Sequence, residues 1–216
     1  MSTPDLSLPS PKPPAAEAVA KARAAMLAEA AAPRRAGWRA GLVKASGTVL
    51  GLGAAVAGVL LMVGACTVDF LASRAVSLSA LLTVGLVAMW ASLRPQGLMS
   101  RLLSLGLVAV SAGVIVLVRG AGAASTQPEW VCTVSHLAVG LAPAAVVITL
   151  LRRMAPNRLR SVVAGLAAGT TGALVGELAC AQSAVHVATF HLSAWAAVAV
   201  AVALISSKVR PTSYAP

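Results

Sequence analysis

The run of residues 102–118, LLSLGLVAVSAGVIVLV, carries no charge and lies between Arg101 and Arg119. A bilayer core of about 30 Å needs roughly 17–25 mostly apolar residues in a helix, so this run is long enough to cross a membrane. The whole chain of 216 residues has the same character, because 58% of it is hydrophobic and only 11% is charged. This composition is typical of a membrane protein and too apolar for a soluble domain.

Five further apolar runs lie on either side of this one, separated by charges, prolines or short polar stretches. We therefore predict an all-α polytopic membrane protein, a bundle of six transmembrane helices preceded by a flexible cytoplasmic segment. The spans are expected at about 44–65, 76–93, 102–118, 131–151, 161–180 and 185–206, with a leader over 1–43 and a tail over 207–216. Glycine and alanine are frequent between Gly165 and Gly176, which favours closely packed helices.

The charge of the chain is lopsided, with 17 Lys and Arg against 6 Asp and Glu and a formal net charge of +11. A nucleic-acid module would gather its basic residues on one face and interleave them with stacking aromatics, but only 3% of this chain is aromatic. The basic residues fall instead in the leader, the tail and the connections after the second and fourth spans; only Arg74 and Arg119 lie on the other side. Basic loops stay in the cytoplasm, so we predict a multi-pass membrane protein with both termini cytoplasmic. Its expected partner is the lipid bilayer, with no direct contact to nucleic acid.

The leader begins with a proline-rich stretch and continues into an alanine-rich segment over 15–32, for which we predict a short helix. Val19 and Met26 share one face of that helix at a spacing of seven residues. Two interpretations remain open: a solvated linker helix, or a short amphipathic segment that docks on a cytosolic partner. The candidate contacts for docking are Val19, Met26, Leu27, Arg34 and Arg35.

The three cysteines and three histidines all fall towards the predicted non-cytoplasmic side. Cys132 and His136 are four residues apart and share a helix face, as do Glu177 and Cys180, which are three apart. His186 and His191 open the last span. The candidate redox or metal residues are Cys132, His136, Glu177, Cys180, His186 and His191.

Two chemistries fit these residue types. Thiolate and imidazole are the ligands that zinc prefers, so Cys132, His136, Cys180 and one of His191, His186 or Glu177 could hold a possible zinc ion, with His191 in the favoured set. Alternatively, Cys132 and Cys180 could form or lose a disulfide in an oxidising compartment. Each residue could also be ordinary packing, and for Cys66 we expect a small buried hydrophobic side chain.

The chain shows no phosphate-binding loop and no catalytic triad spacing, so we expect no enzyme. One rival is a small transporter or channel component, which would need interrupted helices and polar residues at mid-membrane; the first three spans offer almost none. The other rival is a haem or thiol redox membrane protein in which His136 and His191 are axial ligands.

The last 80 or so residues resemble a known family. The matching features are Trp130-Val-Cys132, His136, the helix with Pro143, Leu151-Arg152-Arg153-Met-Ala-Pro156, Gly165-Leu-Ala-Ala-Gly169, Cys180 and Phe190-His191. They are similar to the NrsF-like six-span membrane anti-sigma factors of bacteria, whereas the first three spans agree with that family only in number and length.

The resemblance implies that the leader and the basic inner loops sequester an extracytoplasmic-function sigma factor at the membrane. The size, the proline-rich leader and the sixfold hydropathy look most like the member that restrains the carotenoid-inducing sigma factor CarQ until light exposure. The family resemblance also implies that paired cysteines matching Cys132 and Cys180 take part in sensing oxidants. A stimulus such as light, singlet oxygen or another redox change would then release the sigma factor.

Overall fold

The computed structural model describes residues 16–31, 34–64, 66–94, 97–119, 122, 128–154 and 156–209. Within these ranges every regular element is a helix, and six helices are long and apolar enough to cross a membrane. The predicted all-α, six-span fold class is therefore confirmed. The chain divides into two compact units, residues 1–36 and 37–216, which are described separately.

The first unit contains α1 (Ala16–Ala31), which covers the segment expected to be helical in the leader. The other long helices are α2 (Arg34–Met62), α4 (Ala75–Leu93), α5 (Leu98–Val118), α6 (Trp130–Leu151) and α7 (Arg158–Ala179). The sixth span is made of α8 (Ala184–His186), a π-helix η1 (Val187–Leu192) and α9 (Ser193–Lys208). A short helix, α3 (Val68–Ser73), lies between the first two spans.

Several helices begin earlier than the hydropathy pattern indicated. The first span starts at Arg39 and ends at Met62, the third starts at Leu98 and the fifth at Arg158. Hydropathy reports only the apolar part of a helix, whereas the backbone stays helical through charged residues at either end. Arg101, expected in a loop, lies in the first turn of α5, where its guanidinium donates to the carbonyl oxygens of Ala91 (3.2 Å) and Arg94 (2.8 Å). It thereby satisfies carbonyls left free at the end of α4.

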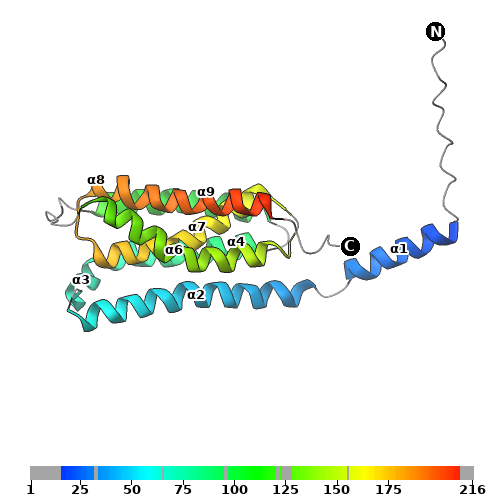
Figure 1. The fold of residues 1–216 in the computed structure, drawn as a ribbon, viewed down its shortest axis with the longest axis horizontal. Coiled ribbons are helices and arrows are strands. Elements are labelled where there is room, and N and C mark those ends of the chain that lie inside the picture. The colour runs from blue at the N-terminus through cyan, green and yellow to red at the C-terminus, as the bar shows by residue number, and fades with distance from the viewer. Residues whose placement is uncertain are drawn as a thin grey trace, which may run out of the picture. The chain divides into compact units, whose positions relative to one another are not determined.

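Helix α7 is the centre of the bundle and packs against α4, α6 and α9 (Figure 1). Fifteen of its 22 residues are buried, although its composition is dominated by glycine and alanine rather than by large apolar side chains. Small residues allow helix backbones to approach closely, and this contact replaces the hydrophobic effect as the source of stability between helices in lipid. The expectation of close packing between Gly165 and Gly176 is met by this helix.

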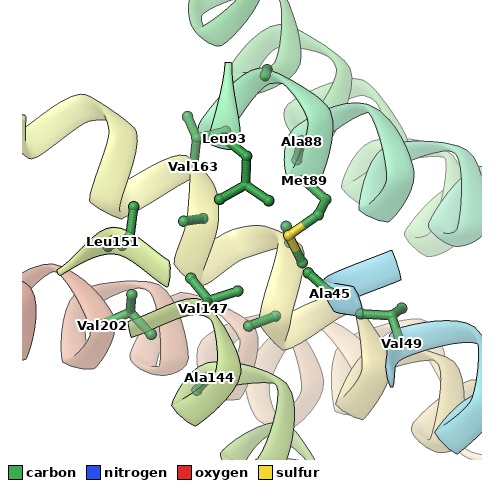
Figure 2. Close-up of a cluster of buried hydrophobic side chains, with 14 of the residues drawn as sticks. Ala45, Val49, Ala88, Met89, Leu93, Ala144, Val147, Leu151, Val163 and Val202 are labelled. Carbon is green, nitrogen blue, oxygen red and sulfur yellow. The ribbon is translucent and has the colours of Figure 1, made fainter. Parts of the chain in front are cut away.

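Two clusters of buried apolar side chains lie along α7. The larger one joins α2, α4, α6, α7 and α9 through Ala45, Val49, Met89, Leu93, Val147, Val163 and Val202, among others (Figure 2). The second contains Leu81, Val84, Ile115, Leu174, Val187 and Trp195. Large apolar side chains also cover the outside of the bundle; Leu117 is 84% exposed and Met62 is 81% exposed. Such a surface suits lipid, because hydrocarbon solvates it at no cost.

Gly165 provides a direct test of this packing. A Cβ atom at Gly165 would lie 2.6 Å from the Cα of Ala199 on α9, a backbone contact that no rotamer can relieve. We expect Gly165→Val to lower the free energy of unfolding by about 1–3 kcal/mol, because α7 and α9 must move apart. Gly113→Val is the matched control, since nothing lies within 4 Å of a Cβ there. Unfolding in mixed detergent micelles measures both; equal stability of the two variants would contradict the packing.

Candidate metal and thiol site

Four side chains from three parts of the fold converge at the end of the bundle where α6 begins and α7 ends. Cys132 lies in the first turn of α6, Cys180 caps the C-terminus of α7, His186 ends α8 and His191 lies in η1. Their Sγ atoms and one ring nitrogen of each histidine all lie within 4.8 Å of one another. We call these four residues the Cys/His cluster.

The π-helix places both histidines in the cluster. In an α-helix of 3.6 residues per turn, residues five apart point about 140° away from each other. A π-helix joins residues five apart by its hydrogen bonds, so His186 and His191 come to one face. Their ring centroids are 5.4 Å apart at an interplanar angle of 65°.

A hydrogen bond from α6 holds the π-helix in register. The Thr133 hydroxyl, one residue after Cys132, donates to the carbonyl oxygen of Phe190 at 3.2 Å. The Phe190 ring in turn packs against His186 with ring centroids 4.9 Å apart. The irregular turn is thus fixed to the same helix that carries the first thiol.

Two glycines of α7 make room for imidazole rings. A Cβ at Gly172 would overlap the His136 ring, and a Cβ at Gly176 would overlap the His191 ring. The glycine-rich sequence of α7 therefore serves the site as well as the packing with α9. His136 lies next to the Cys/His cluster, with its ring edge-on to that of His191 and the centroids 6.1 Å apart.

The Cys/His cluster is closed to solvent on most sides. Cys180, His186 and His191 are buried and Cys132 is half-buried. Among the described residues, neither ring nitrogen of His186 or His191 has a hydrogen-bond partner. Burying a polar atom without a partner costs about 1–3 kcal/mol, so four such nitrogens side by side call for a ligand.

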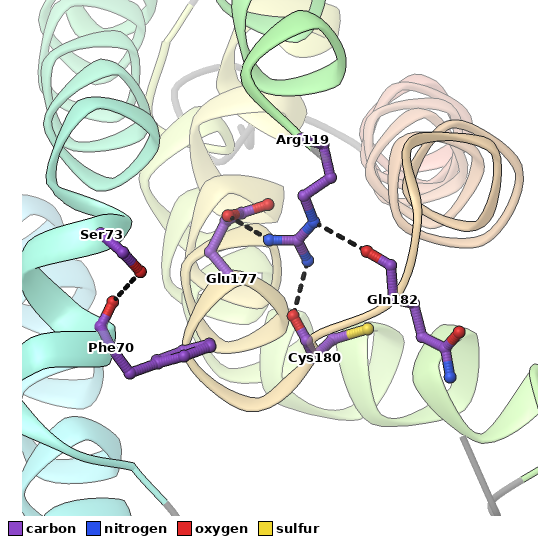
Figure 3. Close-up of polar contacts among 6 residues, drawn as sticks. All are labelled: Phe70, Ser73, Arg119, Glu177, Cys180 and Gln182. Atoms are coloured by element: carbon purple, nitrogen blue, oxygen red, sulfur yellow. Dashed lines mark hydrogen bonds and ion pairs between the residues drawn. The ribbon is translucent and has the colours of Figure 1, made fainter. Parts of the chain in front are cut away.

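An ion pair fixes the loop that carries Cys180. Arg119, at the end of α5, donates to Glu177 Oε2 at 2.8 Å, to the carbonyl oxygen of Cys180 at 2.6 Å and to that of Gln182 at 3.1 Å (Figure 3). The Arg119 and Glu177 side chains are 0% and 2% exposed. Burial lowers the pKa of the Arg119 guanidinium and the Glu177 carboxylate raises it, but an arginine stays protonated in proteins. Arg119 therefore brings a permanent buried charge against the backbone of Cys180.

The four residues that the structure brings together differ in one member from the zinc ligand set favoured by the sequence. Cys132, Cys180 and His191 are together as expected, but His186 takes the place assigned to His136. Glu177 is not in the Cys/His cluster and pairs with Arg119 instead. Cys66 is buried beside the α2–α3 turn, where its thiol contacts the Thr67 carbonyl at 3.6 Å.

Sequence reasoning missed the part played by Arg119. The available signal was its position as one of only two basic residues on the predicted non-cytoplasmic side, on the same level as the intramembrane acid Glu177. In the leader, Val19 is half exposed on α1. The side chains of Met26, Leu27, Arg34 and Arg35 lie outside the described residues.

The chain is similar to a curated protein, the carotenogenesis protein CarR of Myxococcus xanthus. The two are 46% identical over 180 residues, which cover 83% of this chain and 81% of that protein. The match extends well beyond the last 80 residues that carry the resemblance described above. No family model and no solved structure matches the chain.

Proposed function

The chain belongs to the family of the carotenogenesis protein CarR, and we propose that it is a membrane-bound anti-sigma factor that negatively regulates carotenoid genes. In this proposal it holds a CarQ-like extracytoplasmic-function sigma factor at the inner membrane and away from RNA polymerase. Light, singlet oxygen or another redox stimulus ends the sequestration. The carrying observation is the 46% identity to CarR over most of both chains, together with six helices long enough to span a bilayer.

The distribution of charge supports an orientation with both ends of the chain in the cytoplasm. One end of the bundle carries the exposed basic residues Lys44, Arg94, Arg152, Arg153, Arg158 and Lys208. The Cys/His cluster lies at the opposite end of the bundle, where α6 begins and α7 ends. By the positive-inside rule the basic end is cytoplasmic, so the Cys/His cluster faces the outer half of the membrane.

Two cytoplasmic surfaces are available for the sigma factor. Val19 on α1 is 51% exposed, as a docking residue must be before its partner binds. At the basic end of the bundle, a cavity of about 350 Å³ is lined by Arg152, Arg158 and Ser207, among others. Its basic rim suits an acidic segment of a partner.

The stimulus acts on Cys132 and Cys180 in this proposal. In the metal-free form the two thiols form one S–S bond and give up two protons and two electrons, and singlet dioxygen takes up both to become hydrogen peroxide. The sulfur atoms already lie within 4.8 Å of each other, so only a small shift of the helix ends is needed. Such a bond would join the start of α6 to the end of α7 and alter the bundle that carries the leader.

The proposal is tested by co-sedimentation of the full-length protein in membrane vesicles with candidate extracytoplasmic-function sigma factors from the same genome. We expect the membranes to retain the sigma factor, and Val19→Asp to weaken retention about tenfold, since a charge would replace an apolar contact. Glu17→Gln on the same helix is the matched control and should bind normally.

Sequestration obeys mass action, so deleting the gene should switch the carotenoid genes on without a stimulus. If the vesicles retain no sigma factor and the deletion leaves those genes silent, the proposal is wrong.

A further inference from the structure

We propose that Cys132, Cys180, His186 and His191 form a tetrahedral binding site for one zinc ion. The proposal rests on the ligand geometry of this chain alone and does not depend on the anti-sigma function.

The number and type of donors are those of a closed zinc site. Two thiols and two imidazoles make an S₂N₂ set, the Cys₂His₂ combination found in structural zinc sites. Zn–S bonds of about 2.3 Å and Zn–N bonds of about 2.0–2.1 Å place neighbouring donors about 3.3–3.8 Å apart. The four donor atoms lie within 4.8 Å of one another, so a contraction of about 1 Å would complete the site.

The buried imidazoles provide an independent argument for a ligand. His186 is 4% exposed and His191 is 3% exposed, and no described residue offers a hydrogen bond to either ring. A metal ion would take one nitrogen of each ring. Burying these ring nitrogens without hydrogen bonds costs free energy. Metal binding would recover part of that cost.

Charge balance also suits a site at the edge of the membrane. Zinc binding displaces one proton from each thiol to solvent, and two thiolates then neutralise the double charge of the ion. The occupied site has no net charge and carries little of the desolvation penalty that a lone ion would suffer in a low-dielectric region. Cys132 is only half-buried, so the site is not fully enclosed.

Contacts around the Cys/His cluster fix the backbone that carries the proposed ligands. A π-turn inside a helix is uncommon and frequently marks a functional position, and here it is the feature that brings His191 to His186. Arg119 fixes the backbone of Cys180 through its carbonyl oxygen, while Thr133 ties η1 to the helix of Cys132. Contacts that orient metal ligands in this way are part of a metal site.

The test uses full-length protein expressed with zinc, purified in detergent under reducing conditions and freed of loosely bound metal. Elemental analysis should find about one zinc per chain. Cys132→Ser and His186→Ala should each weaken zinc binding by more than about 100-fold, since losing a ligand exceeds the 10–100-fold effect of losing an outer partner. Cys66→Ser removes a buried thiol outside the Cys/His cluster and should keep the zinc.

Cobalt substitution tests the unaltered chain and so does not depend on whether the variants fold. Co²⁺ in the site should show the visible absorption of tetrahedral cobalt and a near-ultraviolet band from thiolate-to-cobalt charge transfer. Absence of these bands, absence of zinc from the wild-type protein, or zinc retained after both ligand substitutions would overturn the proposal. None of these measurements involves the sigma factor, so they stand apart from the test of the proposed function.

Discussion

Replacing Arg119 by methionine is expected to lower the free energy of unfolding by about 3–5 kcal/mol, because it leaves the Glu177 carboxylate buried without its partner. Both side chains are almost fully buried, and Arg119 also holds the carbonyl oxygens of Cys180 and Gln182. Methionine fills a similar volume but donates no hydrogen bond. The measurement is unfolding of the purified protein in mixed detergent micelles, followed by circular dichroism.

The double variant Arg119→Met, Glu177→Gln separates the cost of an unpaired charge from the value of the contact. We expect it to be more stable than Arg119→Met alone, because an amide is cheaper to bury than a carboxylate. Arg119→Lys keeps the charge but loses the planar fork that reaches three oxygens, so its stability should fall between wild type and Arg119→Met. If the single and double variants are equally unstable, the ion pair is not the source of the loss.

Hydropathy was enough to predict the six spans because each is a long, mostly apolar run with few charged residues. It could not place the ends, since Arg101 continues a helix as well as an apolar residue does and then bonds back to α4. Helix α7 shows a second limit. It is the most buried span, yet by composition it is the least hydrophobic, because its glycines stabilise the bundle through close approach.

The sequence placed the cysteines and histidines at one level of the bundle, and the structure brings Cys132, Cys180 and His191 together with His186 rather than with His136. Spacing rules for an α-helix favoured His136, which is four residues after Cys132. They gave no reason to put His186 and His191 on one face, because a π-turn has no signal in the sequence pattern. The π-turn depends on tertiary contacts: Thr133 donates a hydrogen bond to the Phe190 carbonyl oxygen, and Gly176 leaves room for the His191 ring.

The structure links the ion pair to the thiols through one residue. The two terminal nitrogens of Arg119 donate to Glu177 and to the carbonyl oxygen of Cys180 (Figure 3). A shift of the Cys180 backbone would therefore move the guanidinium and disturb its ion pair with Glu177. Because α5 ends at Arg119 and α7 ends at Cys180, movement of this loop would act on both helices. This gives the proposed stimulus a physical route into the bundle.

The double substitution Cys132→Ser, Cys180→Ser is expected to abolish induction of the carotenoid genes by light or oxidant while leaving their repression in the dark intact. Serine is smaller than cysteine but close in shape, and it cannot form the S–S bond through which two thiols pass two electrons to the oxidant. Sequestration of the sigma factor then persists, because mass action favours the complex as long as no disulfide forms between α6 and α7. A reporter for the regulated genes measures the dark and induced levels.

Cys66→Ser is the matched control for that experiment, because Cys66 and Cys180 are each 6% exposed and differ in whether a second thiol lies nearby. The control should respond to light or oxidant as the wild type does. A general effect of placing a hydroxyl in the bundle would reduce induction in both variants, whereas the proposed chemistry reduces it only in the double substitution. Normal induction in the double variant would confine Cys132 and Cys180 to packing or metal binding and would place the sensor of the stimulus elsewhere.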